Sequence, residues 1–135
     1  KALFDALSEN TTLKNLYLDA NAITEKGCRY IADYFDRLKR NNQKGLAGLF
    51  LGVNRIGDKG SKILAESISG YSHLVRLDLG SNRIQISGLD AILQSVRNLP
   101  DLAYLGLGLY KSTSDLGELP NYFDGLGAGL LRRLI

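Results

Sequence analysis

The stretch Leu74-Val-Arg-Leu77-Asp-Leu79-Gly-Ser-Asn82-Arg-Ile84 decides how this chain folds, because its pattern of leucines recurs along the sequence. Residues 13–23 and 46–56 have the same spacing, each with an asparagine in the same place. A fourth copy, residues 102–110, keeps the leucines but has Tyr110 where the asparagine would stand. Alternation of apolar and other residues predicts a short strand in each copy, with its leucines pointing to one side.

Helical segments are predicted between these strands. The first leucines of successive copies are 33, 28 and 28 residues apart, and a glycine stands six residues after each asparagine. Apolar residues follow each glycine at +4 and +8, which is one stripe of a helix. The stripes are Ile31 and Phe35, Leu64 and Ile68, and Ile92 and Val96. A similar stripe, Leu3 and Leu7, predicts that the chain opens inside a helix.

The strand segments resemble the leucine-rich repeat consensus L-x-x-L-x-L-x-x-N-x-L. The 28-residue period is similar to the ribonuclease-inhibitor-like class, and residues 54–65 resemble the GALA-type repeats of bacterial effector proteins. The resemblance implies an α/β leucine-rich repeat solenoid of about four repeats: a curved right-handed coil with parallel strands on its concave face and helices on its convex face. We expect one domain over 1–135, a fragment of a longer array, divided into 1–12 (the helix of a preceding repeat), 13–45, 46–73, 74–101 and 102–135.

Composition excludes several classes of function. A chain of 135 residues suits a single domain, and 26 of them are leucine. One cysteine, Cys28, permits no internal disulfide and suits an intracellular reducing compartment, which would be the host cytoplasm for a translocated effector. One histidine, His73, rules out a multi-histidine metal site, and no apolar run is long enough to span a membrane. The small net charge of +3 argues against nucleic acid as the partner.

Catalytic chemistry finds little support. His73 precedes a predicted strand without a serine or cysteine motif beside it, so we interpret it as a bystander. Cys28 lies at a predicted helix start, which could depress its pKa, but that position alone is weak evidence for a nucleophile. Gly106-Leu-Gly108 lacks the helix start and the acid of a dinucleotide site. We therefore predict a protein that is not an enzyme and that has no cofactor or metal.

The three repeat asparagines have a structural interpretation. Asn21, Asn54 and Asn82 fall where the chain turns away from each strand. Their amides can donate to and accept from backbone groups of the turn that would otherwise lack partners. We assign them to the fold and to no binding partner.

The residues between the inward leucines should point to the concave solvent face, since side chains alternate along a strand. One column across the repeats reads Tyr17, Phe50, Asp78 and Gly106, and the preceding column reads Asn15, Gly48, Arg76 and Tyr104. Neighbouring strands lie about 4.8 Å apart, so Tyr17 and Phe50 should be adjacent. The candidate protein-binding residues of this face are Tyr17, Phe50, Arg76, Asp78 and Tyr104; those of its rim are Asp19, Arg55, Arg83 and Lys111.

Two insertions interrupt the period. Eleven extra residues within Lys111–Leu126, including Tyr122, form either a binding loop beside the concave face or a structural irregularity. Five more, between Ile31 and Leu46, place Arg37, Lys39, Arg40 and Lys44 near one another. This cluster could attract an acidic partner or phosphate, but we favour a solvated helix end whose cations complement the helix C-terminus.

These observations predict a non-enzymatic protein–protein interaction module that binds its partner through the concave face and the 111–126 loop. The resemblance implies three settings. One is a secreted bacterial effector that engages, or inhibits, a host protein or another effector, with an enzyme as one kind of partner. The others are the substrate-recognition part of an F-box-type ubiquitin ligase adaptor and the ligand-sensing repeats of an immune receptor.

Overall fold

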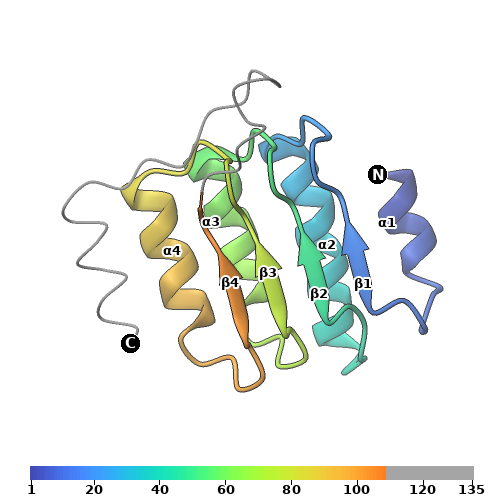
Figure 1. Cartoon of the computed structure of the whole chain (residues 1–135). Helices are drawn as coiled ribbons and strands as arrows, with labels where there is room; N and C mark the ends of the chain where they lie inside the picture. The colour runs from blue at the N-terminus through green and yellow to red at the C-terminus, as the bar shows by residue number, and fades with distance from the viewer. Residues whose placement is uncertain (109–135) are drawn as a thin grey trace.

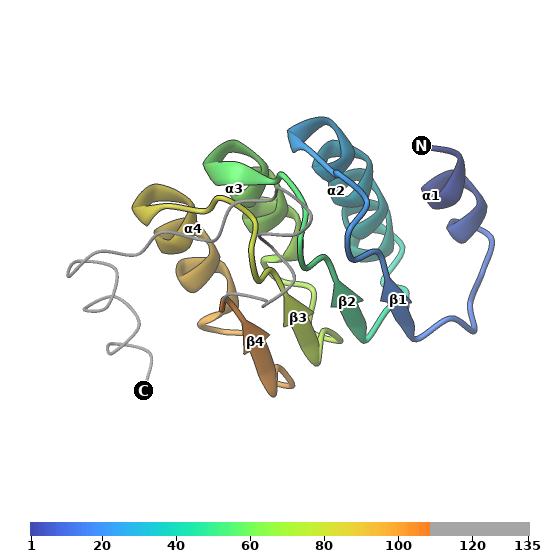
Figure 2. The same cartoon turned by 45° about the horizontal axis from the view of Figure 1, so that its top comes forward.

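Helices and strands alternate strictly along the part of the chain that the structure, a computed structural model, describes: residues 1–108. The elements are α1 (Ala2–Leu7), β1 (Asn15–Tyr17), α2 (Glu25–Arg40), β2 (Gly48–Phe50), α3 (Gly57–Ile68), β3 (Arg76–Asp78), α4 (Ile86–Val96) and β4 (Tyr104–Gly106). The strands form one sheet in the order β1-β2-β3-β4, and each neighbouring pair is parallel. Figures 1 and 2 show two layers, with the sheet on one side and the helices on the other. The predicted α/β solenoid is confirmed.

The register of the sheet follows the leucine spacing. Leu16 pairs with Leu49, Leu49 with Leu77, and Leu77 with Leu105. Because these leucines all point toward the helices, they stack into one core with the helical stripes. All six predicted stripe residues of α2, α3 and α4 are buried: Ile31, Phe35, Leu64, Ile68, Ile92 and Val96.

The prediction for the first helix is only half right. Leu7 is buried as expected, but Leu3 is 43% exposed and Phe4 takes its place in the core. The Phe4 ring lies 5.6 Å from the ring of Tyr34 on α2. Within residues 1–108, α1 contacts only α2 and is followed by β1 without a strand of its own before it. The side of α1 that faces α2 is therefore the side that becomes buried.

The five extra residues of the repeat 13–45 lengthen its helix. α2 has 16 residues, whereas α3 has 12 and α4 has 11. The longer helix ends in Arg37, Lys39 and Arg40, as the interpretation of a basic helix C-terminus requires. Insertion at this point leaves the sheet register unchanged, because the added length extends the helix beyond its neighbour.

The buried asparagines Asn54 and Asn82 join neighbouring coils, whereas the exposed Asn21 amide donates to the Asp19 carbonyl of its own turn. Asn54 is fully buried; its Oδ1 accepts hydrogen bonds of 2.9 Å from the backbone N–H groups of Asn21 and Ile23 in the preceding coil. Its Nδ2 donates to the carbonyls of Leu18 and Leu51. Asn82 repeats this arrangement one coil further, with its Nδ2 donating to the Leu51 carbonyl at 2.8 Å. The predicted structural role of these residues is confirmed.

The residue before each asparagine has left-handed backbone geometry. Ala20, Val53 and Ser81 have φ values of 56°, 55° and 52°. Such geometry costs an L-residue about 1–2 kcal/mol, and the repeated hydrogen bonds of the turn hold it in place. The backbone N–H groups of Ala20 and Val53 donate to the carbonyls of Gly52 and Gly80 in the next coil.

The repeated spacing of the helix glycine has a packing cause. A side chain at Gly60 would place its Cβ 2.7 Å from Cγ2 of Ile56 and 3.0 Å from Sγ of Cys28. The first turn of α3 therefore packs directly against Ile56, which precedes it, and against Cys28 of α2. Only glycine allows this close approach without moving a neighbour.

Candidate protein-binding face

One face of the sheet has no helix on it among the described residues, and we call it the open face. The side chains of Tyr17 on β1 and Phe50 on β2 project from it and stack, with ring centroids 4.3 Å apart and an interplanar angle of 8°. Tyr17 is 66% exposed, whereas Phe50 is half-buried beneath it. The adjacency predicted from the repeat columns is confirmed.

A glycine makes room for this stack. A Cβ at Gly48 would lie 3.0 Å from Cε2 of Phe50 and would also meet the side chain of Asn15. The Phe50 ring can therefore extend along its own strand toward Gly48, with the Tyr17 ring of the neighbouring strand stacked against it. The glycine in this column positions the aromatic pair.

Two more predicted residues are exposed further along the open face. Arg76 and Tyr104 are cross-strand neighbours in the register of β3 and β4. Arg76 is exposed, and Tyr104 is 48% exposed. The four exposed or half-exposed side chains Tyr17, Phe50, Arg76 and Tyr104, which we call the aromatic face, span all four strands.

Asp78 departs from the prediction, because its side chain is buried at 5% exposure. Its Oδ1 accepts a 2.9 Å hydrogen bond from the backbone N–H of Gly80. The same oxygen lies only 2.6 Å from where a Cβ of Gly106 would stand. The carboxylate therefore leans sideways over the glycine of β4 instead of projecting into solvent, and it does not belong to the exposed surface.

The rim residues have separate surroundings. Asp19 is exposed, and its Oδ1 accepts a 3.0 Å hydrogen bond from the Gly52 backbone, so it also supports the turn. Arg55 is exposed, and Arg83 is half-buried. Lys111, Tyr122 and the 111–126 loop lie outside the described residues.

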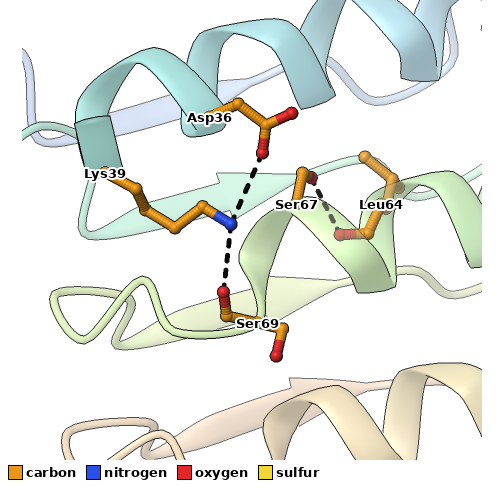
Figure 3. A network of polar contacts seen from close by, with 5 residues as sticks. All are labelled: Asp36, Lys39, Leu64, Ser67 and Ser69. Carbon is orange, nitrogen blue, oxygen red and sulfur yellow. Dashed lines mark hydrogen bonds and ion pairs between the residues drawn. The ribbon is translucent and has the colours of Figure 1, made fainter.

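The basic end of α2 carries a contact between coils that the sequence did not indicate. The Lys39 ammonium donates a 3.0 Å hydrogen bond to the Ser69 carbonyl, at the C-terminal end of α3, and lies 3.4 Å from Asp36 (Figure 3). Lys39 thus binds a carbonyl that the end of α3 leaves without a helical partner. The side chain belongs to the fold, unlike Arg40 and Lys44, which are exposed.

Neither Cys28 nor His73 has a catalytic environment. Cys28 is fully buried; burial first, and the Glu25 carboxylate second, raise the pKa of its thiol to about 12. The depressed pKa considered for a helix start is therefore wrong, because burial outweighs the helix terminus. The His73 ring packs edge-on against Tyr71 with centroids 5.7 Å apart. No group of three or more metal-ligating side chains occurs within residues 1–108.

Tyr71 is a structural residue that the repeat pattern did not reveal. It is 2% exposed, and its hydroxyl donates to the Leu46 carbonyl at 2.7 Å and accepts from the Gly45 N–H at 3.0 Å. Burial raises the pKa of this hydroxyl to about 12. Because the tyrosine stands in the variable stretch before a strand, no periodic signal marked it.

Comparison with known proteins agrees with the repeats and the fold. A family model described as leucine-rich repeat matches residues 9–32 and 72–93. The human protein named NACHT, LRR and PYD domains-containing protein 13 is 30% identical over 112 residues, which cover 82% of this chain and 10% of that protein. The chain thus spans about a tenth of the length of this curated relative.

These matches and the four-coil architecture identify the chain as a leucine-rich repeat protein. Leucine-rich repeat domains are generally protein-interaction modules and typically have no enzymatic activity. Across residues 1–108, no helix has the length and apolar character needed to cross a membrane.

Proposed function

We propose that this leucine-rich repeat chain is a non-enzymatic recognition module that binds a partner protein through the aromatic face. The observation that carries the proposal is the exposed stack of Tyr17 on Phe50. Tyr17 is 66% exposed, so its ring presents a large apolar area to water. Burying that area against a partner is favourable, because apolar surface is then removed from water.

The composition of the aromatic face also favours a protein partner. Tyrosine and arginine are the residue types most enriched among those that dominate binding energy at protein interfaces. Arg76 and Tyr104 supply both types on the same face as the stack. The sheet holds these side chains on a hydrogen-bonded backbone, so little conformational entropy is lost when they bind.

The exposed rim supports the same conclusion. Arg55 lies outside the core on the turn after β2, and Asp19 occupies the turn after β1. We propose that these charges set the orientation of the partner, while the aromatic face supplies most of the affinity. The 111–126 loop, with Lys111 and Tyr122, remains a proposed extension of this surface.

The test is affinity capture with the full chain immobilised, comparing the wild type with a Tyr17→Ala/Phe50→Ala double variant. We expect the specific partner to be captured at least about tenfold less by the double variant, since interface aromatics of this kind cost 2 kcal/mol or more when truncated. Quantitative mass spectrometry measures the difference. Equal capture by both proteins would overturn the proposal.

A matched control separates binding from folding. Lys62 and Glu66 are both exposed on α3, in the helical layer on the other side of the sheet. A Lys62→Ala/Glu66→Ala variant should retain the partner, and urea unfolding should show that all three proteins are folded under the conditions of capture.

The human relative favours one setting over the others. Its name places an LRR domain in a protein that also contains NACHT and PYD domains. We propose that the present repeats likewise form the ligand-sensing part of a larger multidomain protein, as in an immune receptor. The bacterial effector setting has only the resemblance of residues 54–65 to GALA-type repeats in its favour.

A further inference from the structure

The last turn of α2 and the loop after it concentrate the positive charge of the molecule. Residues 36–44 contain four basic side chains against one acidic side chain, a net charge of +3. The entire chain of 135 residues has the same net charge of +3. The remaining acidic and basic residues therefore balance one another, and the excess lies in this one segment.

Most of this charge has no partner within the described chain. The single acid of the segment, Asp36, is paired with Lys39, which also binds the Ser69 carbonyl (Figure 3). Asp33 stands one turn before Arg37 but forms no ion pair with it. Arg37, Arg40 and Lys44, which we call the basic edge, have no ion-pair partner among residues 1–108.

The C-terminal end of α2 balances only part of the positive charge in residues 36–44. The carbonyls at the C-terminal end of a helix are equivalent to roughly half a negative charge. Two of them already accept hydrogen bonds here: Leu38 from the Gln43 N–H at 2.8 Å and Lys39 from the Asn42 N–H at 3.1 Å. Half a negative charge cannot balance three cations, so most of the positive charge of this segment is left to attract anions.

The backbone that carries the basic edge is held at both ends. Asn42 has a φ of 46° and closes the helix with the two hydrogen bonds of a Schellman motif. A few residues later, the buried Tyr71 hydroxyl binds both Gly45 and Leu46. The loop between these anchors is therefore pre-organised, which lowers the entropy cost of binding a partner.

A small polar hollow lies against the same loop. Its volume is about 130 Å³, and its polar lining includes Lys39, Asn42, Gln43, Ser72 and His73, from two successive coils. These side chains can hydrogen-bond a peptide backbone that lies beside the basic edge. Asn42 and Gln43 of this lining lie between Arg40 and Lys44 in the chain, so hydrogen-bonding groups adjoin the basic edge.

We propose that the basic edge is a second interaction surface, separate from the aromatic face, which binds an acidic segment of a partner protein. Arg37 and Arg40 are three residues apart on one side of α2, and guanidinium forks match the geometry of carboxylates. Three unpaired cations suit a short run of Asp or Glu. They are fewer than the six to ten phosphate contacts typical of nucleic-acid binding.

The experiment uses a fluorescein-labelled peptide of six glutamates and fluorescence anisotropy with the full chain at low salt. The test variant is Arg37→Gln/Arg40→Gln/Lys44→Gln. The control variant, Lys26→Gln/Lys59→Gln/Lys62→Gln, removes three exposed cations from other helical positions and changes the net charge equally. We expect the test variant to bind roughly tenfold more weakly and the control to change by less than about threefold, since exposed ion pairs contribute 0.2–1 kcal/mol each.

Three results would overturn the proposal. Equal losses in the two triple variants would mean that the peptide responds only to net charge, and no loss in the test variant would mean that it binds elsewhere. Vesicles containing phosphatidylserine and a single-stranded oligonucleotide serve as rival anions. Tighter binding of either than of the peptide, lost in the test variant, would assign the basic edge to that class instead of protein. Urea unfolding of each variant confirms that it is folded.

Discussion

The carboxylate of Asp58, in the first turn of α3, accepts a 3.0 Å hydrogen bond from the backbone N–H of Gly88 in the first turn of α4. It also accepts a 2.8 Å hydrogen bond from Gln85, the N-cap residue of α4, whose own side chain forms no capping bond. One coil therefore supplies the helix cap of the next. This contact joins the convex layer in the way that the asparagines join the turns.

Replacing Asp58 by alanine should destabilise the protein by about 1 kcal/mol, because two N–H groups at the start of α4 lose their acceptor. Urea unfolding measures the change. Asp58→Asn keeps a capping oxygen of the same geometry and should retain most of the stability. A loss in the asparagine variant as large as in the alanine variant would show that charge, and not capping, is the source.

The buried asparagine should be far more important than its exposed counterpart. Asn54→Ala removes the shared acceptor of the Asn21 and Ile23 N–H groups and the side-chain donor to the Leu18 carbonyl, and we expect a loss of about 3 kcal/mol. Asn21 occupies the same position of its repeat but is exposed, and within residues 1–108 its side-chain amide donates only to the Asp19 carbonyl. Asn21→Ala should cost less than about 1 kcal/mol in the same unfolding experiment. Similar costs for the two would contradict the assigned role of coil-to-coil bridging.

Relieving the backbone strain of a left-handed residue should stabilise the fold. Ala20 is exposed with a φ of 56°, so Ala20→Gly removes steric strain without removing packing, and we expect a gain of about 1 kcal/mol. Gly57 has a φ of 63° and open space around it. Gly57→Ala should therefore cost about 1 kcal/mol for the same reason. Shifts in the opposite directions would refute the argument from backbone geometry.

Alkaline pH should weaken the contact made by Tyr71. Burial raises the pKa of its hydroxyl from the ordinary value of 10.0 to about 12, so the folded state retains the proton more strongly than the unfolded state. Its contribution to stability should be complete below pH 10 and should be lost as the pH rises from 10 to about 12. Tyr71→Phe should make the decline of unfolding free energy over this range shallower than in the wild type, even though the variant is less stable at neutral pH.

The thiol of Cys28 should react slowly in the native protein. A pKa of about 12 leaves little thiolate near neutral pH, and the side chain is fully buried. We expect alkylation by iodoacetamide at mildly alkaline pH to be at least about a hundredfold slower in buffer than in concentrated urea. Comparable rates in the two solutions would mean that the core around α2 opens readily.

The stack of Tyr17 on Phe50 was predictable because the sheet is parallel and its repeats are in phase. Once the leucines set the register, the residue between them on one strand must lie beside its counterpart on the next. The fate of Asp78 was not predictable in the same way. Its strand position was correct, but its rotamer depends on the absence of a side chain at Gly106 and on the Gly80 N–H.

By itself the sequence determined the solenoid, its strand register, the buried stripes of the helices and the structural use of the asparagines, since all of these follow from a period that repeats along the chain. Tertiary structure decided which side chains reach from one coil to the next: Lys39 to Ser69, Asp58 to Gly88, and Tyr71 to Gly45 and Leu46. These contacts depend on the distance and angle between successive coils, which a one-dimensional period does not contain. For the same reason, the aromatic face could be predicted from the repeat pattern, whereas the loop of the basic edge, held by Asn42 and the Tyr71 hydroxyl, became visible only in the folded structure.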